Sequence, residues 1–301
     1  MKPEIFLTGA GGFVGQNLVK ILKDEYAFVK FDRQAEVAIK SEVVVHLAGI
    51  AHDLKNTKNE SDYHEVNVVL TQKIFNAFLA SEEAKVFIFF SSVKAVADVV
   101  DGVLTESFLP APATVYGKSK QAAEAFLLAH ELPADKRIYI LRPALIHGPG
   151  NKGNLNMLNK LVQKGLPWPL GSFENKRSYC SIQNAGFVLN ELIRNPQIPS
   201  GIYNLVDDVP LSTNEVIRIM AELEGRGVRI LSIPKFVIRF LAAIGDVLHL
   251  PLNNESLLKL TSSFVVGNQK LIEAMGKPLP YSSREGLKAN LKKPGYRDSS
   301  F

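Results

Sequence analysis

The chain has 301 residues, of which 46% are hydrophobic and 22% charged, a composition typical of globular proteins and unlike that of disordered ones. Its single cysteine, Cys180, excludes an intramolecular disulfide and favours a reducing compartment, so a cytoplasmic location is expected. The net charge of +5 suits an anionic small molecule, and the lack of basic runs interleaved with aromatic residues argues against nucleic acid as a partner.

Short apolar runs alternate with amphipathic segments in the first half of the chain, which predicts a parallel sheet covered by helices on both faces. The predicted strands are Glu4–Thr8, Phe28–Asp32, Val43–Leu47, Val86–Ser91, Ile138–Arg142 and Gly201–Val206. The predicted helices are Gly12–Lys23, Ser61–Ala80 and Tyr116–His130. Only the ten residues 33–42 separate the second strand from the third. Because a crossover helix with a further strand needs more than that, one strand is expected to be vestigial or missing.

The length predicts two domains, since a domain usually has about 100–200 residues. Loops rich in glycine and proline follow Arg142, and helices dominate from Leu211 onward. We therefore predict a doubly wound α/β (Rossmann) domain of residues 1–143 plus about 178–206, and a smaller substrate-binding domain of residues 144–177 and 207–301.

The longest apolar stretch, Phe236–Leu250, is interrupted by Arg239, Asp246 and His249 and is too short to span a membrane. We therefore expect no integral membrane segment. With Lys235 and Arg239 beside its phenylalanines, the stretch suits either a helix at a membrane surface or a helix packed in the substrate domain. Its small basic face favours the packed helix and leaves membrane contact open.

A glycine-rich turn, TGAGGFVG at Thr8–Gly15, follows the first predicted strand and opens the first predicted helix. Gly9 permits the tight turn, Gly12 lets the backbone approach a pyrophosphate at the positive end of the helix dipole, and Gly15 allows the helix to pack on the strand. The pattern predicts a bound dinucleotide. Asp32 stands where a carboxylate accepts hydrogen bonds from the adenosine ribose, which favours NAD, while the neighbouring Arg33 keeps NADP possible.

Tyr116 and Lys120 are four residues apart and share one face of a predicted helix. An ammonium about 4 Å from a phenolate, at an effective dielectric constant of 20, stabilises it by about 4 kcal/mol, which predicts a Tyr116 pKa of about 7. Such a tyrosine can take a proton from a substrate hydroxyl or return one to a carbonyl. Ser91 and Ser92 end a strand, at the edge where ligands bind in open parallel sheets, so a serine hydroxyl there can contact the reacting oxygen.

The sequence resembles the extended short-chain dehydrogenase/reductases, specifically the nucleotide-sugar epimerase/dehydratase group, over nearly its whole length. The motifs that carry the resemblance are TGAGGFVG, HLAG at His46–Gly49, Asn67, Ser91–Ser92, YGKSK from Tyr116 with Glu124, RPALIHGPG from Arg142, RSYCSIQN from Arg177, YNLVDDVPLSTNEVI and REGLKANL. The catalytic residues that it implies are Ser92, Tyr116 and Lys120. The implied cofactor is NAD, with NADP possible, bound by Gly9, Gly12, Phe13, Val14, Gly15, Asp32, Arg33, Leu47, Ala48, Gly49, Asn67, Tyr116, Lys120 and Pro143.

The resemblance also implies a nucleoside diphosphate sugar as substrate. No metal ion is expected, because the six histidines show no spacing typical of metal ligands. The implied substrate-binding residues are Ser92, Lys94, Tyr116, Asn154 and Arg177, and among them Arg177 is the residue that pairs with the diphosphate. Related 4,6-dehydratases carry an Asp-Glu pair directly after the catalytic hydroxyl, whereas Val93-Lys94 stands there in this chain, so that elimination lacks its acid and base. The sequence is most similar to the UDP-4-keto-6-deoxy-N-acetylhexosamine 4-reductases and the 4-epimerases.

We therefore expect NAD(P)-dependent hydride transfer at C4 of a nucleoside diphosphate sugar, by a 4-reductase or a 4-epimerase. A UDP-linked amino sugar used in surface polysaccharide synthesis is the expected substrate. The alternatives are a reductase of a non-nucleotide carbonyl, against which Arg177 argues, and a non-enzymatic NAD(P)-sensing regulator, against which the intact Tyr116–Lys120 pair argues. In the resembling family the helices that hold Asn67 and Tyr116 pair with their copies. Because the apolar stripe of Tyr63–Phe78, with Phe75 and Leu79 beside it, exceeds what one sheet face requires, a homodimer is expected.

Overall fold

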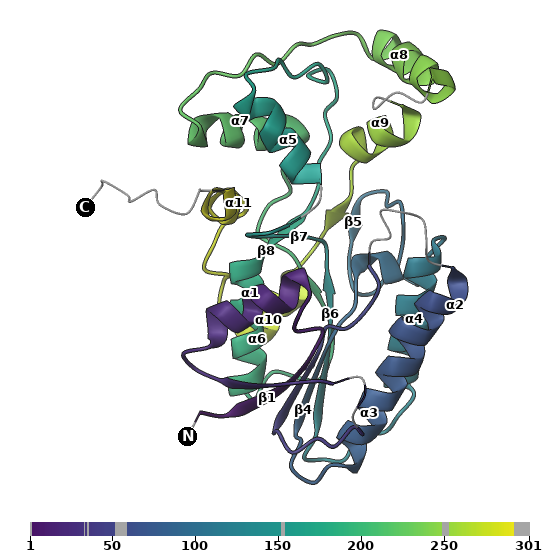
Figure 1. Ribbon diagram of the computed structural model, residues 1–301, viewed down its shortest axis with the longest axis vertical. Helices are drawn as coiled ribbons and strands as arrows, with labels where there is room; N and C mark the ends of the chain where they lie inside the picture. The colour runs from purple at the N-terminus through teal and green to yellow at the C-terminus, as the bar shows by residue number, and fades with distance from the viewer. Residues whose placement is uncertain are drawn as a thin grey trace, which may run out of the picture.

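A parallel sheet forms the centre of the computed structural model, which describes residues 2–32, 34, 36–51, 59–151, 154–248 and 253–291 (Figure 1). The sheet is six-stranded in these residues, and its strands are β1 (Glu4–Thr8), β2 (Ala27–Lys30), β3 (Val43–His46), β4 (Val86–Phe90), β6 (Arg137–Pro143) and β9 (Gly201–Leu205). The strand order is β2-β1-β3-β4-β6-β9, and every neighbouring pair is parallel. The doubly wound sheet predicted from the sequence is confirmed.

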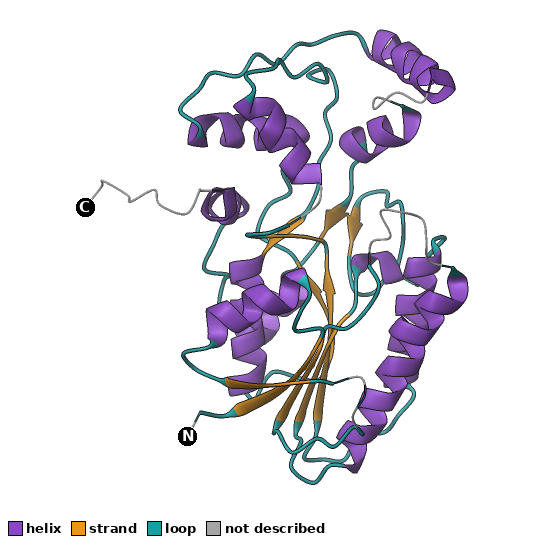
Figure 2. Cartoon of the chain, viewed as in Figure 1, coloured by secondary structure: helices purple, strands orange, loops and turns teal. Residues whose placement is uncertain are grey.

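Helices cover both faces of this sheet, as Figure 2 shows. On one face lie α1 (Phe13–Leu22), α6 (Ile182–Arg194) and α10 (Gln269–Met275); on the other lie α2 (Glu60–His64), α3 (Leu70–Ala80) and α4 (Val115–Leu128). Strand β4 serves both cores, because side chains alternate along a strand. Ile88 packs toward the α1 side, and Phe87 and Phe89 pack toward the α3 side.

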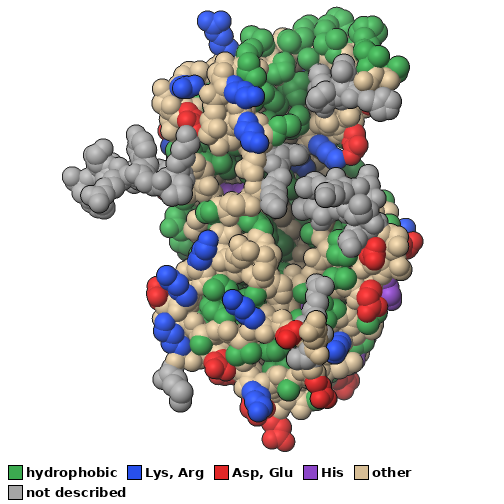
Figure 3. All heavy atoms as spheres, in the orientation of Figure 1, with side chains coloured by type: hydrophobic (Ala, Val, Ile, Leu, Met, Phe, Trp, Pro, Cys, Tyr) green, Lys and Arg blue, Asp and Glu red, His purple; other side chains and the backbone are tan. Residues whose placement is uncertain are grey.

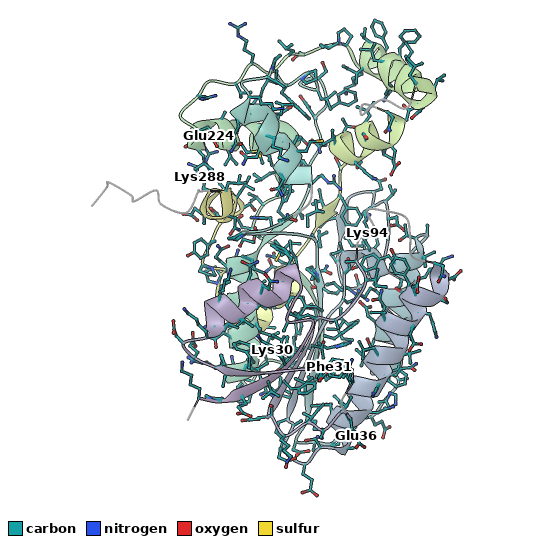
Figure 4. The ribbon with its side chains drawn as sticks, in the orientation of Figure 1. Lys30, Phe31, Glu36, Lys94, Glu224 and Lys288 are labelled. Atoms are coloured by element: carbon teal, nitrogen blue, oxygen red, sulfur yellow. The ribbon has the colours of Figure 1, made fainter. Side chains whose placement is uncertain are left out.

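The connection after β2 departs from a regular doubly wound fold. The described residues between Lys30 and Val43 form no strand, so β2 is the edge of the sheet. The side chain of Val29 is 40% exposed as a result, and Lys30 and Phe31 follow one another where the chain leaves this edge (Figure 4). Of the two sequence-based alternatives, a missing strand therefore holds for the described part of this segment. A lysine on an exposed edge also discourages pairing with another sheet.

A second group of helices lies beyond the carboxyl ends of the strands (Figure 1). It comprises α5 (Asn154–Gln163), α7 (Thr213–Leu223), α8 (Lys235–Leu248), α9 (Asn254–Thr261) and α11 (Ser283–Leu291). These helices have their own apolar core around Trp168, Ile217 and Met220. Two short parallel pairs, β7 (Leu145–His147) with β8 (Tyr179–Ser181) and β5 (Val103–Leu104) with β10 (Val265–Val266), lie between this core and the sheet.

The predicted domain boundaries stay a prediction. Helix α10 packs against β9 on the sheet, although it falls in the range 207–301 assigned to the substrate domain. Strand β8, within the 178–206 assigned to the sheet domain, pairs with β7 outside the main sheet. No helix in the described ranges combines the length and apolar character needed to cross a bilayer.

The apolar surplus predicted for the Tyr63–Phe78 stripe is not found on α3. Ile74, Phe75 and Phe78 are completely buried within the single chain, against Phe87 of β4 and the inner face of α4. A four-residue repeat reveals which side of a helix is buried, but it does not reveal how deeply. The homodimer consequently stays a prediction that rests on family resemblance.

Candidate active site

The glycine turn between β1 and α1 is an open backbone cradle. Gly9 has a positive φ of 69°, and a Cβ there would lie 2.7 Å from the backbone nitrogen of Ala48. A Cβ on Gly15 would lie 2.4 Å from the carbonyl oxygen of Gly9, so the helix can pack this closely only with glycine. Gly12 begins α1 in an extended conformation, and no side chain caps the helix. The first N–H groups of α1 are therefore left to bind an anion.

A directed chain of hydrogen bonds runs from this turn through His46 at the end of β3. The Thr8 hydroxyl accepts from the N–H groups of Leu47 and Ala48 at 3.1 and 3.0 Å, so it must donate its own proton to His46 Nδ1, 2.6 Å away. The Thr71 hydroxyl donates to the Asn67 carbonyl, so His46 Nε2 must donate to Thr71. His46 is therefore the neutral Nε2–H tautomer, and its burial lowers its pKa to about 3.

Asn67 lies in a π-helical turn, Glu65–Val69, between α2 and α3. Its side-chain oxygen accepts from Ile50 N at 2.8 Å, and its side-chain nitrogen donates to Ile50 O at 3.1 Å and to Ser119 Oγ at 2.8 Å. A π-turn adds a residue to a helical turn and is frequent at functional sites. In this structure it turns a buried amide toward the loop after β3 and toward α4.

The side chain of Lys120 is aimed at the same place. It is 3% exposed, and its ammonium donates to the Phe90 carbonyl at 2.9 Å and lies 4.6 Å from the centre of the Phe89 ring. A Cβ on Gly49 would come within 3.1 Å of Lys120 Nζ and 2.9 Å of Asn67 Oδ1. Burial lowers the pKa of Lys120 to about 8, and nearby Glu124 raises it. The structure thus brings Gly49, Asn67 and Lys120 together at the ends of β3 and β4.

Tyr116, the predicted partner of Lys120, forms a side-chain hydrogen bond with Ser92. Burial raises the pKa of Tyr116 above its ordinary value, the hydrogen bond with Ser92 lowers it, and Tyr63 and Glu124 raise it. The prediction of a Tyr116 pKa of about 7 is therefore wrong for this structure. Tyr116 and Lys120 are neighbours on one helix face, but the Lys120 ammonium donates its hydrogen bond to the Phe90 carbonyl. The cost of burying a phenolate is therefore the largest influence on the Tyr116 pKa.

A close contact at Gly117 sets the distance between the strand end and the helix. Ser92 begins a short 3₁₀ turn, Val93–Ala95, and the carbonyl of Lys94 in that turn faces α4. A Cβ on Gly117 would lie 2.4 Å from this carbonyl oxygen. The glycine therefore permits the approach that places the Ser92 hydroxyl against Tyr116.

Two cationic residues, Lys94 and Arg177, both lie at Phe264, where the helices beyond the sheet meet its carboxyl edge. Lys94, labelled in Figure 4, donates to the Asp98 carbonyl at 2.9 Å and lies 4.5 Å from the centre of the Phe264 ring. Burial lowers the pKa of Lys94, the charge of Asp98 raises it, and the charge of Arg177 lowers it. Arg177 pairs through its backbone with Phe264. Arg177 Nη1 donates to the Lys259 carbonyl, while Arg177 Nε is buried with no hydrogen-bond partner in the described residues. Burial lowers the pKa of Arg177 as well.

Comparison with known proteins supplies the family. Residues 5–205 match the sequence profile of the NAD dependent epimerase/dehydratase family. The chain belongs to this family. Membership confirms the resemblance seen in the sequence, the prediction of an enzyme, and NAD as the cofactor.

Three relatives of this epimerase/dehydratase illustrate the match. UDP-glucose 4-epimerase of Vibrio cholerae is 31% identical over 96% of this chain and 94% of its own length. N-acetyl-alpha-D-glucosaminyl-diphospho-ditrans,octacis-undecaprenol 4-epimerase of Escherichia coli O157:H7 is 28% identical over 74% of this chain and 72% of its own. The solved UDP-N-acetylglucosamine 4-epimerase of Bacillus cereus has a TM-score of 0.74 at 20% identity, covering 95% of this chain and 97% of that one, and supports the fold.

The residues expected to bind the cofactor in this family member lie at the carboxyl ends of the sheet strands or at the start of α1. Phe13 and Val14 begin α1, Leu47 and Ala48 follow β3, and Pro143 ends β6. The glycine turn fits a pyrophosphate, because a Cβ at Gly9 or Gly15 would collide with backbone while one at Gly11 would meet nothing within 4 Å. The exposed Asp32 follows β2, and its carboxylate accepts from Gln34 N at 3.0 Å. Arg33 lies outside the described residues, as does the side chain of Asn154 at the start of α5.

Sequence reasoning missed several residues that hold this site in place. Thr71 and Ser119 complete the hydrogen bonds of His46 and Asn67, and a helical spacing of four between Asn67 and Thr71 was the available signal. Asp98 accepts from the N–H groups of Ala113 and Thr114 at 2.8 and 3.1 Å and so holds the start of α4, with no signal in the sequence.

A buried ion pair joins α4 to strand β6 of the sheet. Glu124 of α4 and Arg142 of β6 pair at 2.6 Å with side chains 3% exposed, and Ser91 donates to the same carboxylate. Both charged residues belong to the motifs quoted for the family, but the contact between them is a product of the fold. Because Glu124 is one helical turn from Lys120, the pair fixes the part of α4 that carries the lysine.

Proposed function

We propose that this epimerase/dehydratase transfers hydride at C4 of a nucleoside diphosphate sugar, with Ser92, Tyr116 and Lys120 as its catalytic residues. The observation that carries the proposal is the buried, unpartnered Nε of Arg177, whose backbone pairs with Phe264, together with the Lys94 ammonium 4.5 Å from the centre of the Phe264 ring. The like charges of Lys94 and Arg177 repel, and a buried Nε without a partner is costly. A dianionic diphosphate bound by both residues relieves both costs.

The roles of the side chains follow from their contacts. NAD, when bound, supplies the hydride acceptor for the sugar carbon. Tyr116 takes the proton of the sugar hydroxyl or returns it, and Ser92 holds the reacting oxygen through a hydrogen bond. Lys120, held by the Phe90 carbonyl, and Asn67, held by Ile50 and Ser119, keep α4 and the loop after β3 in position.

A 4-epimerase acting on a UDP-linked sugar is the form of the proposal that the relatives support, with an amino sugar for surface polysaccharide as the expected substrate. The match to a UDP-glucose 4-epimerase extends over nearly the whole chain. A 4-reductase uses the same side chains and differs in consuming a reduced cofactor. Incubation with a UDP-sugar and catalytic NAD, followed by separation of the C4 epimers, distinguishes them: an epimerase reaches an equilibrium mixture, whereas a reductase leaves the sugar unchanged without stoichiometric NAD(P)H.

The substrate class can be tested by thermal shift with UDP, GDP, dTDP and CDP. A ligand at 100 times its Kd adds about 2.7 kcal/mol to the free energy of unfolding. We expect UDP to raise the melting temperature most. Stabilisation by NAD with none by any nucleoside diphosphate would contradict a nucleotide-linked substrate and favour a lipid-linked sugar, a reductase of an uncharged carbonyl or a non-enzymatic NAD(P) sensor.

Arg177 provides the matched test within the chain. Arg177→Ala should lower kcat/KM about a hundredfold, or about 2.7 kcal/mol, mainly through KM, because the phosphates are bound alike in the ground and transition states. Arg177→Lys should recover part of the loss, since a point charge cannot reproduce the two-pronged contact. Lys176→Ala removes the same charge from the exposed neighbouring residue and should leave kcat/KM within about twofold. Equal losses in Arg177→Ala and Lys176→Ala would reject a specific role for Arg177.

A second carrier fits the same site. The relative from Escherichia coli O157:H7 has a sugar linked through a diphosphate to undecaprenol in its name, and the diphosphate is what Lys94 and Arg177 would contact in either substrate. Activity on a polyprenyl diphosphate-linked N-acetylhexosamine, with none on the UDP-sugar, would replace the nucleotide by a lipid and leave the role of Arg177 intact.

A further inference from the structure

The outer face of α8 is apolar and uncovered. Phe236, Phe240, Ile244 and Val247 follow one another at the spacing of a single helical stripe, and their side chains are 73%, 67%, 36% and 76% exposed. Figure 3 shows the hydrophobic side chains gathered at this end of the molecule. Contiguous apolar surface of this kind marks an interaction site, whereas single exposed apolar residues do not.

The packing of α8 is already complete without this stripe. Ile238, Ala242 and Gly245 on its opposite face are buried, and Ile238 and Ala242 join the core of the helices beyond the sheet. The packed helix favoured by the sequence is therefore present, but only one side of α8 packs against the rest of the protein. A helix with apolar residues on a second side besides its buried one is normally covered on that side as well or placed at a membrane.

The charges around the stripe are basic. Lys235 and Arg239 are exposed on α8, and neither forms an ion pair within the described part of the chain, although the Lys235 ammonium lies 5.8 Å from the centre of the Phe173 ring. The one acid of the helix, Asp246, keeps its charge and is directed at α9, where its carboxylate accepts from the backbone and side chain of Asn254. An apolar stripe flanked by cations that form no ion pair complements a surface with an apolar interior and an anionic outer layer.

We propose that α8 docks the protein on an anionic membrane surface, with Phe236 and Phe240 in the acyl boundary and Lys235 and Arg239 at the headgroup phosphates. Phenylalanines on one side and basic residues beside them are the features of an interfacial helix. The exposed apolar side chains of α8, with Leu241 and Leu248 added to the stripe, belong to one helix about 21 Å long and about 10 Å wide. This area is smaller than the about 800 Å² that each partner of a stable dimer contributes. Since α8 lies at the far end from the sheet (Figure 1), docking leaves the carboxyl edge of the sheet, near which Lys94 lies (Figure 4), clear of the bilayer plane.

The test is co-sedimentation of the full-length protein with vesicles. Binding should be strong to vesicles of phosphatidylglycerol and phosphatidylcholine, weak to phosphatidylcholine alone, and reduced by salt because the basic residues contribute through charge. The double variant Phe236→Glu/Phe240→Glu should lose at least tenfold in partitioning, and Lys235→Gln/Arg239→Gln should lose the preference for anionic vesicles. Leu109→Glu changes an 88% exposed leucine on another surface and should bind as the wild type does.

Folding and activity serve as controls, because the four substituted residues of α8 are outside the proposed active site. These are Lys235, Phe236, Arg239 and Phe240. The variants should keep the melting temperature and the turnover of a water-soluble UDP-sugar. A wild-type protein that does not sediment with anionic vesicles, or a double-Glu variant that binds them as well as the wild type, overturns the proposal. Loss of a dimer in the double-Glu variant without any vesicle binding also overturns it and makes α8 an interface between copies. The vesicle-binding and dimer outcomes do not depend on which sugar carrier is used.

Discussion

At the scale of single residues, burial rather than a neighbouring charge sets the ionisation of Tyr116. Its pKa is raised in the structure, so the protonated hydroxyl is favoured and can give its proton to a C4 carbonyl oxygen, whereas taking the proton of a sugar hydroxyl requires the phenolate. Tyr116→Phe should lower kcat at least a hundredfold and leave the Kd for NAD within about threefold, since the hydroxyl serves chemistry more than affinity. Calorimetry and turnover measure the two effects, and Tyr281→Phe, on an exposed tyrosine, is the control. Retention of more than a tenth of the activity would remove Tyr116 from the proton path.

His46 gives a pH-dependent prediction at the same scale. Its pKa is about 3 in the fold and about 6.5 in the unfolded chain, so between these values the unfolded state binds more protons. The free energy of unfolding should therefore fall as pH is lowered from 6.5 toward 3, by up to about 1.4 kcal/mol per pH unit from this residue. Urea unfolding of wild type and His46→Gln at pH 4.5–7.5 compares the slopes. Identical slopes would show that His46 is not buried as the neutral tautomer.

At the scale of elements, the contact between α4 and the turn after β4 sets the geometry of the site. Alanine is favoured over glycine in a helix by about 1 kcal/mol, so Gly117→Ala would stabilise an isolated helix. In this fold its Cβ would lie 2.4 Å from the Lys94 carbonyl, and one element must move. We expect at least a tenfold lower kcat and a free energy of unfolding lower by about 1–3 kcal/mol. Gly227→Ala, which meets nothing within 4 Å, is the control. Unchanged kcat in Gly117→Ala would mean that the Ser92–Tyr116 distance does not depend on this contact.

At the scale of the whole molecule, the predicted homodimer is still to be measured. The buried side of α3 is used within one chain, so the pairing surface must come from outward residues such as Leu128 of α4, which is 51% exposed. Sedimentation velocity at micromolar concentration should give twice the chain mass of 33.2 kDa, and Leu128→Glu should shift the equilibrium toward monomer. A wild-type monomer under these conditions would contradict the prediction.

Much of the fold and of the site was open to prediction from local pattern. The first strand is found within the predicted bounds, Glu4–Thr8, and the helix predicted over Tyr116–His130 forms over Val115–Leu128. Apolar runs and glycine spacing report backbone conformation directly, because they depend on neighbours in sequence. The π-turn around Asn67 was not predictable, since its extra residue is stabilised by Ile50 and Ser119, which are distant in the chain.

By itself the sequence determined the parallel sheet and the glycine turn after its first strand, because both depend on residue type and local spacing, and through the family resemblance it predicted Ser92, Tyr116, Lys120 and Arg177 as site residues. Only the tertiary structure decided how these groups behave. Burial raised the Tyr116 pKa where charge proximity predicted a decrease, the bonds of Thr8 and Thr71 chose the His46 tautomer, and the packing of Ile238 left the phenylalanines of α8 outside. Desolvation and hydrogen-bond direction depend on what surrounds a group on every side, and residues far apart in the sequence supply those surroundings.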